Sequence, residues 1–366
     1  MLLPGLTGGG AERVMLDLCR GFHQRGHSVD LLIGQVRGEF AQSVPPGVDL
    51  VDLGTHFRMT TLGAGAWRIA AYLRRRRPAA LLAALEMACF SAVLGGRLAR
   101  TGTRIVVSQR NHITVARQLG GSLGMRMSPV LARFLYPRAD GVTAVSAGVA
   151  EELASLTHMS LDRIAVLPNP VVTPELHELA DARPEHPWFS DGGAPVVLGA
   201  GRLHPQKDFG TLIRAVALAR ERRACRLMII GEGSLRDSLT RLAADLNLGA
   251  DFALPGFQRN PFACMRHASV FVLSSRCEGM PGVLVQAMAC GCPVVSTDCR
   301  SGPAGLLNCG ALAPLVPVGD AGAMAEGICK ALDGEQDTNA LREQAERHSF
   351  DRSVEAYLAV LLPSRG

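Results

Sequence analysis

The chain predicts two α/β domains, each a doubly wound parallel sheet covered by helices on both faces. Short apolar runs rich in β-branched residues alternate with helical periods along its whole length. The runs are continuously apolar, which is typical of parallel strands buried on both faces. A length of 366 residues also exceeds what one simple core requires.

The first domain is expected to span 1–172. Its strands are predicted at 29–33, 48–53, 81–85, 104–108, 141–145 and 163–167, and its main helices at 11–25, 62–77 and 87–100. Only Met1–Pro4 precede the glycine-rich loop, so the first strand, which is usually central, is shortened. We therefore expect the natural start to lie upstream of Met1. The Pro-, Glu- and His-rich stretch at 173–195 then predicts a linker.

The second domain is expected to span 196–347. Its strands are predicted at 196–200, 226–230, 252–254, 270–273, 293–296 and 312–316, and its helices include 209–222 and 235–246. Residues 348–366 form a tail with an amphipathic helix at 350–362. In doubly wound sheets ligands bind at the carboxyl ends of the strands, so we expect the two domains to face one cleft.

Charge is distributed unevenly between the two halves. Residues 1–170 carry a net charge of +8, and residues 171–366 carry a net charge of −3. A basic first half favours an anionic partner, either a membrane surface or a phosphorylated acceptor. Aromatic residues make up 5% of the chain and are scattered, which argues against a nucleic-acid stacking platform.

The cysteines and the apolar runs indicate the compartment. No stretch is long enough to span a bilayer, and no signal peptide is evident. The ten cysteines form no C-x-x-C pair, and Cys19, Cys225 and Cys290 are interpreted as small hydrophobic residues. Cys290, Cys292 and Cys299 are an alternative metal site, but their spacing is poor for zinc. We expect no metal, no disulfide framework and a cytoplasmic protein.

The run from Ser274 to Thr297 carries the most chemistry. It predicts a loop, a buried helix with Pro281 in the first helical position, a turn at Gly291 that needs φ > 0, and a buried strand. A helix start presents free N–H groups and the positive end of a dipole, which favour a phosphate. Glu278, just before the helix, can accept hydrogen bonds from hydroxyls. Phosphate and hydroxyls together indicate a nucleotide sugar.

A second polar loop, at 201–208, follows an apolar strand and precedes a helix. Arg202 offers a planar fork of donors, and Lys207 offers a compact charge. Five residues apart on one loop, they are suited to grip two phosphates of a diphosphate. The alternative is a solvated loop in which Asp208 caps the following helix.

Two polar segments follow strands in the first half. Gly8–Gly10 let a phosphate or sugar approach the backbone closely, or they form a mere tight turn. G-x-G-x-x-G is poorly matched and no acidic residue ends the second strand, so no nicotinamide site is expected. Arg110, Asn111 and His112 follow the strand at 104–108 and would face the cleft. His112 is either a proton shuttle or hydrogen-bond donor to an acceptor, or a structural residue.

Arg74–Arg77 end a predicted helix that carries Trp67 and Tyr72. Cations are favourable at a helix C-terminus, and Pro78 stops the helix. The same arginines and aromatic rings would suit a surface of anionic lipid. Both interpretations stay open at this point.

Taken together, these segments resemble the retaining glycosyltransferases of family 4 (glycosyl transferases group 1), which have the GT-B fold. The resemblance covers nearly the whole chain, through G-G-G-A-E-R at 8–13, V-S-Q-R-N at 107–111, V-S-A-G-V at 145–149, L-P-N-P at 167–170, G-R-L-H-P-Q-K-D at 201–208, G-E-G at 231–233, L-P-G-F-Q-R-N-P at 254–261, the run at 274–297 and S-G-P at 301–303. Each motif is weak alone, but their order and spacing together are highly specific.

The resemblance implies a UDP-, GDP- or similar sugar donor held mainly by the second domain, an acceptor on the first domain, and no metal or other cofactor. Arg202 and Lys207 would bind the diphosphate, and Glu278 would contact the donor sugar. To this catalytic set we add His112, on the strength of its place after the strand at 104–108. Gly9 and Gly10 would close over the phosphates, and Gly256, Phe257 and Gln258 would lie near the base. The sugar and phosphate would meet the backbone of Gly279, Met280, Pro281, Gly282, Val283 and Leu284. The candidates on the acceptor side are Arg110, Asn111 and His112. The tail helix would cross back onto the first domain.

Two positions depart from the family pattern. The family usually has two Glu residues separated by seven others, and the second Glu usually accepts hydrogen bonds from the ribose hydroxyls. In this chain Gln286 stands in place of that second Glu. A Gln carbonyl still accepts but carries no charge, so each bond weakens by about 1 kcal/mol. Gln109 likewise replaces a frequent Glu. We expect weaker donor binding with activity retained.

The sequence thus predicts an enzyme that moves a hexose or N-acetylhexosamine to a lipid-linked glycan acceptor in cell-surface polysaccharide or lipopolysaccharide biosynthesis. Arg202, Lys207 and the helix start would stabilise the leaving diphosphate. The rivals are a sugar-nucleotide epimerase or phosphorylase on the same fold, and a catalytically weak partner protein. We expect a cytoplasmic protein with peripheral contact at the inner face of the membrane, and no nucleic-acid partner.

Overall fold

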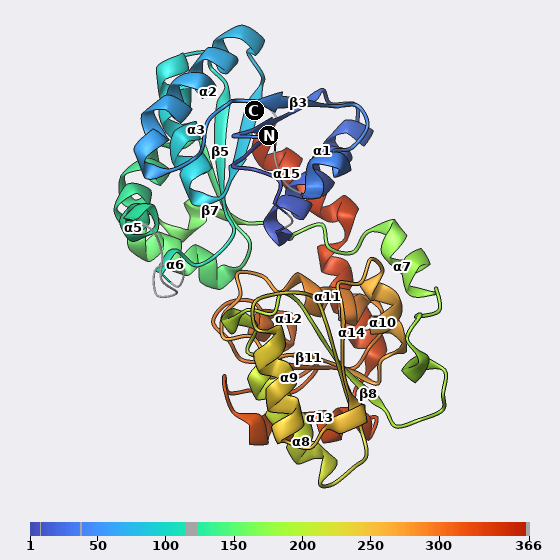
Figure 1. Cartoon of the computed structure of the whole chain (residues 1–366). Helices are drawn as coiled ribbons and strands as arrows, with labels where there is room; N and C mark the ends of the chain where they lie inside the picture. Colours follow the sequence, from blue (N-terminus) through green and yellow to red (C-terminus); the bar gives the residue numbers. More distant parts are fainter. Residues whose placement is uncertain (8, 37–38, 115–122, 364–366) are drawn as a thin grey trace. The chain divides into compact units, whose positions relative to one another are not determined.

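The computed structural model describes residues 1–7, 9–36, 39–114 and 123–363. The chain forms two compact units (Figure 1). Unit 1 comprises Met1–Pro170 and Phe350–Gly366, and unit 2 comprises Val171–Ser349. Within the described ranges, every helix is too short or too polar to cross a lipid bilayer.

Unit 1 is built on a seven-stranded parallel sheet in the order β3-β2-β1-β4-β5-β6-β7. Its strands are β1 (Leu2–Leu3), β2 (Val29–Ile33), β3 (Val48–Asp52), β4 (Ala80–Ala84), β5 (Arg104–Gln109), β6 (Gly141–Ala144) and β7 (Ile164–Val166). Its helices include α1 (Gly10–Gln24), α2 (Leu62–Arg76), α3 (Glu86–Ala99), α5 (Leu123–Leu135), α6 (Ala147–Thr157) and α15 (Phe350–Leu361). The predicted strands are confirmed to within one residue, because continuous apolar runs mark them sharply.

Helices α1 and α15 pack side by side on one face of this sheet (Figure 1). Their buried side chains, such as Leu18 and Tyr357, share one apolar cluster with Leu3, Leu31 and Val106 from the strands. The tail helix therefore belongs to the first unit, which confirms what the resemblance implies.

Unit 2 is built on a six-stranded parallel sheet in the order β10-β9-β8-β11-β12-β13. Its strands are β8 (Val196–Ala200), β9 (Arg226–Ile230), β10 (Phe252–Gly256), β11 (Val270–Leu273), β12 (Val294–Thr297) and β13 (Leu315–Val316). Its helices include α7 (Pro174–Ala180), α8 (Phe209–Arg220), α9 (Arg236–Asp245), α10 (Pro261–His267), α11 (Gly282–Ala289), α12 (Pro303–Leu306), α13 (Ala321–Leu332) and α14 (Thr338–Ala345). The last strand is shorter than the predicted 312–316.

Alternate residues of these strands enter two different cores. Leu198 and Phe271 pack into a cluster with residues of α7, α10, α11 and α14. Their neighbours Val197 and Val272 pack into a second cluster with residues of α8, α9 and α13. Side chains of successive strand residues point to opposite faces, so both faces are buried and the strands are apolar throughout.

The stretch at 173–195 is not a plain linker. It begins with α7, in which Pro174 occupies the first turn and Leu176 and Ala180 are buried in a core of unit 2. α7 packs against α10. The many Pro, Glu and His residues predicted a linker, but two apolar residues four apart on one helical face, Leu176 and Ala180, anchor the segment in this core.

Candidate active site

The strand order of unit 2 changes direction between β8 and β11. β8 has β9 and β10 on one side, whereas β11 leads to β12 and β13 on the other. The two strands run parallel and pair directly, with Phe271 opposite Leu198. The loops that leave their carboxyl ends therefore diverge at a switch point, where doubly wound folds bind ligands. These loops carry the motifs at 201–208 and 274–281.

Hydrogen bonds tie the two loops together. Ser274 Oγ donates to the Lys207 carbonyl at 2.7 Å, and the Arg276 N–H donates to the Gln206 carbonyl at 2.8 Å. Gln206 Nε2 in turn donates to the Cys277 carbonyl at 2.9 Å. The loops thus form one structure, and residues 207 and 278 are held at a fixed separation.

The centre of this structure is an ion pair between Lys207 and Glu278. Lys207 Nζ donates to Glu278 Oε1 at 2.6 Å, and Ser275 Oγ donates to the same oxygen at 2.6 Å. The side chains of Lys207 and Glu278 are only 18% and 9% exposed. Ser275 is held in turn by Thr297, at the end of β12, whose Oγ1 donates to the Ser275 carbonyl at 2.6 Å. The sequence predicted roles for Lys207 and Glu278 but not for Ser275, whose only signal is a hydroxyl three residues before the acid.

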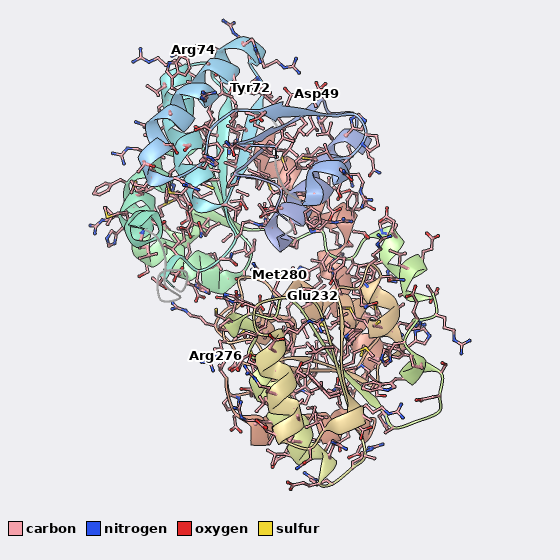
Figure 2. All side chains as sticks on the ribbon, viewed as in Figure 1. Asp49, Tyr72, Arg74, Glu232, Arg276 and Met280 are labelled. Carbon is pink, nitrogen blue, oxygen red and sulfur yellow. The ribbon has the colours of Figure 1, made fainter. Side chains whose placement is uncertain are left out.

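Of the other charged side chains of the loops, Arg202 and Arg276 are exposed, whereas Asp208 is only 10% exposed. Arg202 is exposed at the end of β8. Asp208 stands at the N-cap of α8, but its carboxylate makes no cap bond and instead accepts from Arg276 Nε at 3.0 Å. Asp208 therefore occupies the N-cap position, as the helix-cap alternative predicts, but its side chain does not cap the helix. Figure 2 shows Arg276 on this loop.

Helix α11 begins one residue later than predicted. Pro281 is its N-cap, with ψ +82°, and Gly282 is the first helical residue. The Gly282 N–H donates to the Met280 carbonyl at 3.0 Å, and the Leu284 N–H donates to the Pro281 carbonyl at 3.0 Å. Because Pro281 has no N–H, the ligand donors expected between 279 and 284 reduce to Gly279, Met280 and Val283. The exit at Gly291 has the expected positive φ, +75°.

The position that departs from the family pattern lies on the same helix. Gln286 is half-buried, whereas its neighbours Val285 and Ala287 are fully buried. Its backbone carbonyl accepts the Cys290 N–H at 3.0 Å within the helix end. The side chain thus lies on the part of α11 that the core leaves accessible.

The segments expected near the base lie at the same end of the sheet. Gly256 ends β10, followed by Phe257, which is 73% exposed, and the half-buried Gln258. Glu232, after β9, pairs with Arg236 at 2.9 Å. Glu232 and Met280 appear at the same end of unit 2 in Figure 2. An exposed aromatic ring beside these strand ends is suited to stack on a base.

Two glycines around Glu232 are required by packing. A Cβ at Gly231 would lie 2.0 Å from the Gly201 carbonyl oxygen, and one at Gly233 would lie 2.4 Å from the Leu203 carbonyl oxygen. The G-E-G motif therefore brings the loops after β8 and β9 into backbone contact. The packing of the protein alone therefore requires glycine at both positions, whether or not a ligand binds.

Unit 1 buries Arg110. Its guanidinium donates to Tyr357 Oη at 2.8 Å, to Asn169 Oδ1 at 2.8 Å and to Ser108 Oγ at 3.3 Å. The expectation that this side chain faces a ligand is thus wrong for the structure described, because Arg110 instead links β5 to the tail helix α15. Asn111, the next residue, is exposed.

His112 is buried beside Glu152 of α6. Its Nδ1 lies 3.2 Å from Glu152 Oε2, and the Ile113 N–H donates to the same oxygen at 2.8 Å. Burial alone would raise the pKa of Glu152, but hydrogen bonds from His112 and Thr114 outweigh it and lower that pKa. Glu152 therefore fixes the imidazole ring, a positioning contact that no sequence spacing revealed.

Glu86 is a second carboxyl of unit 1 that the sequence motifs did not predict to be part of a site. Glu86 follows β4 and opens α3, and burial raises the pKa of its carboxyl above the usual value. Its contacts include Gln109, at the end of the neighbouring strand β5. The Glu86 carboxyl thus lies at the carboxyl ends of these strands, close to the position expected for the acceptor side. The signal available in the sequence was an acid directly after an apolar strand.

The glycine-rich loop of unit 1 is held by Glu12. The Gly9 N–H donates to Glu12 Oε2 at 3.1 Å, and Thr7 Oγ1 donates to Glu12 Oε1 at 3.0 Å. Gly10, the first residue of α1, is exposed. Gly8 lies outside the described residues.

The cysteines have the character of core residues. All ten are free thiols, and burial raises the pKa of Cys290 and of Cys299 to about 12. A thiol with so high a pKa resists forming the thiolate that zinc requires. In the part of the chain that the structure describes, no three His, Cys, Asp or Glu side chains gather closely enough to hold a metal.

Comparison with known proteins places this arrangement in a family. The sequence model of Glycosyl transferases group 1 matches residues 184–348, and that of Glycosyltransferase Family 4 matches residues 8–174. The chain is 30% identical over 261 residues, 71% of its length and 69% of the relative's, to N-acetylgalactosamine-N,N'-diacetylbacillosaminyl-diphospho-undecaprenol 4-alpha-N-acetylgalactosaminyltransferase of Campylobacter jejuni. It is 27% identical, over 96% of both chains, to lipopolysaccharide core biosynthesis glycosyltransferase LpsE of Rhizobium meliloti.

The solved structures agree on the fold. Anabaena HepE in complex with UDP aligns over 99% of both chains with a TM-score of 0.76 at 20% identity. The two parallel sheets and the returning tail helix are those of the GT-B fold. The chain therefore belongs to the family 4 glycosyltransferases of group 1.

Proposed function

We propose that this glycosyltransferase moves a hexose or N-acetylhexosamine, with retention of the anomeric configuration, from a nucleotide-diphosphate sugar to a lipid-linked glycan acceptor of the cell envelope. The observation that carries the proposal is the Lys207–Glu278 pair at the switch point of unit 2. It places a cation suited to a diphosphate beside a carboxylate suited to sugar hydroxyls.

In the proposed reaction the bond between the anomeric carbon and the diphosphate breaks, and negative charge grows on the phosphate. An acceptor hydroxyl attacks from the same face and forms the new bond to the anomeric carbon. Lys207 and the exposed Arg202 stabilise that charge, together with the start of α11. Glu278 accepts hydrogen bonds from the sugar, and Ser275 holds its carboxylate in place. Two side-chain cations supply the charge neutralisation, so the proposal includes no metal or other cofactor.

The relatives support the finer parts of this proposal. The Campylobacter enzyme is named for an N-acetylgalactosaminyl transfer to a sugar on diphospho-undecaprenol, which motivates a lipid-linked acceptor. The Rhizobium enzyme is named for lipopolysaccharide core biosynthesis. HepE was solved with UDP, which makes a uridine nucleotide the first donor base to test.

A lipid-linked acceptor would bring the enzyme to a membrane surface, and we include peripheral contact in the proposal. Helix α2 exposes Trp67, at 65%, on the same helix as the exposed Arg68, Arg74 and Arg75. An aromatic ring among arginines suits an interface with anionic lipid. The contact predicts co-flotation with phosphatidylglycerol vesicles that weakens in Trp67→Ala and at high salt.

The test is turnover of a panel of nucleotide sugars with a short-chain polyprenyl-diphosphate glycan as acceptor. We expect nucleotide release coupled to an extended acceptor, with the new linkage in the donor's anomeric configuration by NMR. Lys207→Ala should lower the transfer rate at least a hundredfold, about the cost of removing one preorganised transition-state donor. The matched control is Lys330→Ala, which changes the chain's one other lysine, exposed at the end of α13.

Each rival has its own outcome in this assay. An epimerised donor or a free sugar phosphate in place of an extended acceptor would favour the epimerase or phosphorylase. Absence of nucleotide release from every donor would favour a partner protein without catalysis. Transfer that survives Lys207→Ala unchanged would overturn the assignment of the site.

A further inference from the structure

Unit 1 has a switch point of its own. Its sheet changes direction between β1 and β4, because β2 and β3 lie on one side and β5, β6 and β7 on the other. β1 and β4 run parallel and pair directly, so the loops at their carboxyl ends diverge where doubly wound sheets bind ligands. Leu85 and Glu86 follow β4 at this point. In unit 2 the acid Glu278 follows β11, which has the corresponding place in its sheet.

The turn after β4 has an unusual backbone and is open to solvent. Leu85 has φ +71° and ψ +134°, a conformation that is rare for a residue other than glycine. Leu85, Glu86 and Met87 are each half-buried, whereas Ala84 before them and Ala88 after them are fully buried. Strained backbone persists where the surrounding structure requires it, often at ligand sites. A ligand can therefore reach the strained turn and the carboxyl that it carries.

The Glu86 carboxylate is held in place by two neutral donors. Ser128 of α5 and Gln109 of β5 hydrogen-bond to it, and these two residues are only 1% and 2% exposed. The Gln109 amide is itself fixed, because Tyr136 Oη donates to its Oε1 at 2.6 Å and its Nε2 donates to the Asn111 carbonyl at 2.7 Å. A carboxylate can accept about four hydrogen bonds, so these two donors leave room for a ligand.

A carboxylate at this position costs stability. Burial raises the pKa of Glu86 by more than the hydrogen bonds from Ser128 and Gln109 lower it, and the nearby Glu152 raises it further. An acid whose pKa is higher in the folded state destabilises the fold at pH values above its unfolded pKa. A carboxylate that only served the helix dipole of α3 would do so in contact with water. The buried and fixed arrangement is instead that of a binding group.

We propose that Glu86 is a specificity-determining residue for the acceptor, whose carboxylate accepts hydrogen bonds from hydroxyl groups of a neutral sugar in the acceptor glycan. This inference rests on the proposed transfer to a glycan. The half-buried Leu85 and Met87 beside the carboxylate suit the apolar face of a pyranose ring. A carboxylate repels phosphate, so Glu86 takes the sugar end of the acceptor rather than its diphosphate.

The first test is sugar binding in the absence of a donor, which does not depend on transfer. Saturation-transfer NMR measures the affinities of methyl β-glucoside, methyl β-galactoside and methyl N-acetyl-β-glucosaminide for the unchanged protein and for Glu86→Gln. The substitution keeps the size of the side chain and removes its charge, so affinity for the preferred glycoside should fall about tenfold. Glu151→Gln, an exposed acid on α6, is the matched control and should bind like the unchanged protein.

Deoxy analogues of the preferred glycoside identify the hydroxyl that Glu86 contacts. The unchanged protein should bind the analogue that lacks this hydroxyl about tenfold more weakly. Glu86→Gln should discriminate little between the two sugars, because both changes remove the same hydrogen bond. In the transfer assay the variant should raise the KM for the acceptor and leave the KM for the donor unchanged. Its unfolding temperature should equal or exceed that of the unchanged protein.

The proposal is overturned if none of the three glycosides binds the unchanged protein, or if Glu86→Gln binds them equally well. A lower unfolding temperature of Glu86→Gln with unchanged affinity would make Glu86 a structural residue. Tighter binding of glucose 1-phosphate than of the neutral glycosides, lost in neither variant, would make a phosphorylated group the ligand. Transfer that does not respond to Glu86→Gln would reject this inference alone. Glycoside binding that depends on Glu86, without any transfer, would reject the proposed function and leave the sugar site.

Discussion

The Lys207–Glu278 pair can be broken one partner at a time, which tests whether the site is assembled before a ligand arrives. Lys207→Met removes the ammonium that lies 2.6 Å from Glu278 Oε1 and leaves a carboxylate that is 9% exposed. Removing one partner of a buried pair costs about 3–5 kcal/mol. Because the Lys207 side chain retains 18% exposure, we expect the lower end, a loss of about 3 kcal/mol in the free energy of unfolding.

The double variant makes the test specific. Glu278→Gln alone should cost about 2 kcal/mol, because the ammonium then loses its counter-charge. Lys207→Met with Glu278→Gln should cost clearly less than the sum, which gives a coupling energy of about 2 kcal/mol. Urea unfolding followed by circular dichroism measures these differences, provided that the m-value of the transition stays constant.

Lys330→Met is the control for loss of a lysine. Lys330 is exposed near the end of α13, so the change should shift the free energy of unfolding by about 0.5 kcal/mol or less. Additive effects of the two site variants, or single effects no larger than this control, would refute the assembled site. Lys207 and Glu278 would then not be paired in the free protein.

Three further changes test other parts of the account. Ser275→Ala should lower the transfer rate about tenfold with nucleotide affinity unchanged, because the hydroxyl donates to the Glu278 carboxylate; a parallel loss of affinity would contradict this. Gln286→Glu should keep activity or tighten donor binding, and a tenfold loss in kcat/KM would show the ribose assignment to be wrong. His348 is half-buried, and desolvation lowers its pKa to about 4, below the unfolded value of 6.5, so stability should fall by up to about 3 kcal/mol as pH drops from 6.5 to 4. Urea unfolding across that range should lose this slope in His348→Asn, and a flat profile for the unchanged chain would contradict the burial of His348.

The sequence predicted the parts of the fold that follow from local patterns. Continuous apolar runs located the strands because parallel strands are buried on both faces. The αL exit at Gly291 was likewise predictable from one residue type. The interpretation failed where packing decides: α7 forms because Leu176 and Ala180 reach a core, although the surrounding composition resembles a linker.

The residues of the candidate site also fall into two groups, those that the sequence predicted and those whose contacts depend on long-range packing. Lys207 and Glu278 were identified from residue type and from their place after apolar strands, but their contact at 2.6 Å depends on the pairing of β8 with β11. Arg110 was expected to face a ligand, yet its partner Tyr357 lies 247 residues away in the chain. Such long-range partners leave no local trace in the sequence. Glu152, which positions His112, was missed for the same reason.

The most direct test of the central claim is a crystal structure of the protein with the nucleotide diphosphate of its donor. The account predicts that the two phosphates lie within hydrogen-bond distance of Lys207 Nζ and the Arg202 guanidinium, at the carboxyl ends of β8 and β11. The ribose should then contact Gln286. A diphosphate bound elsewhere in the chain, with the Lys207–Glu278 pair untouched, would contradict the account.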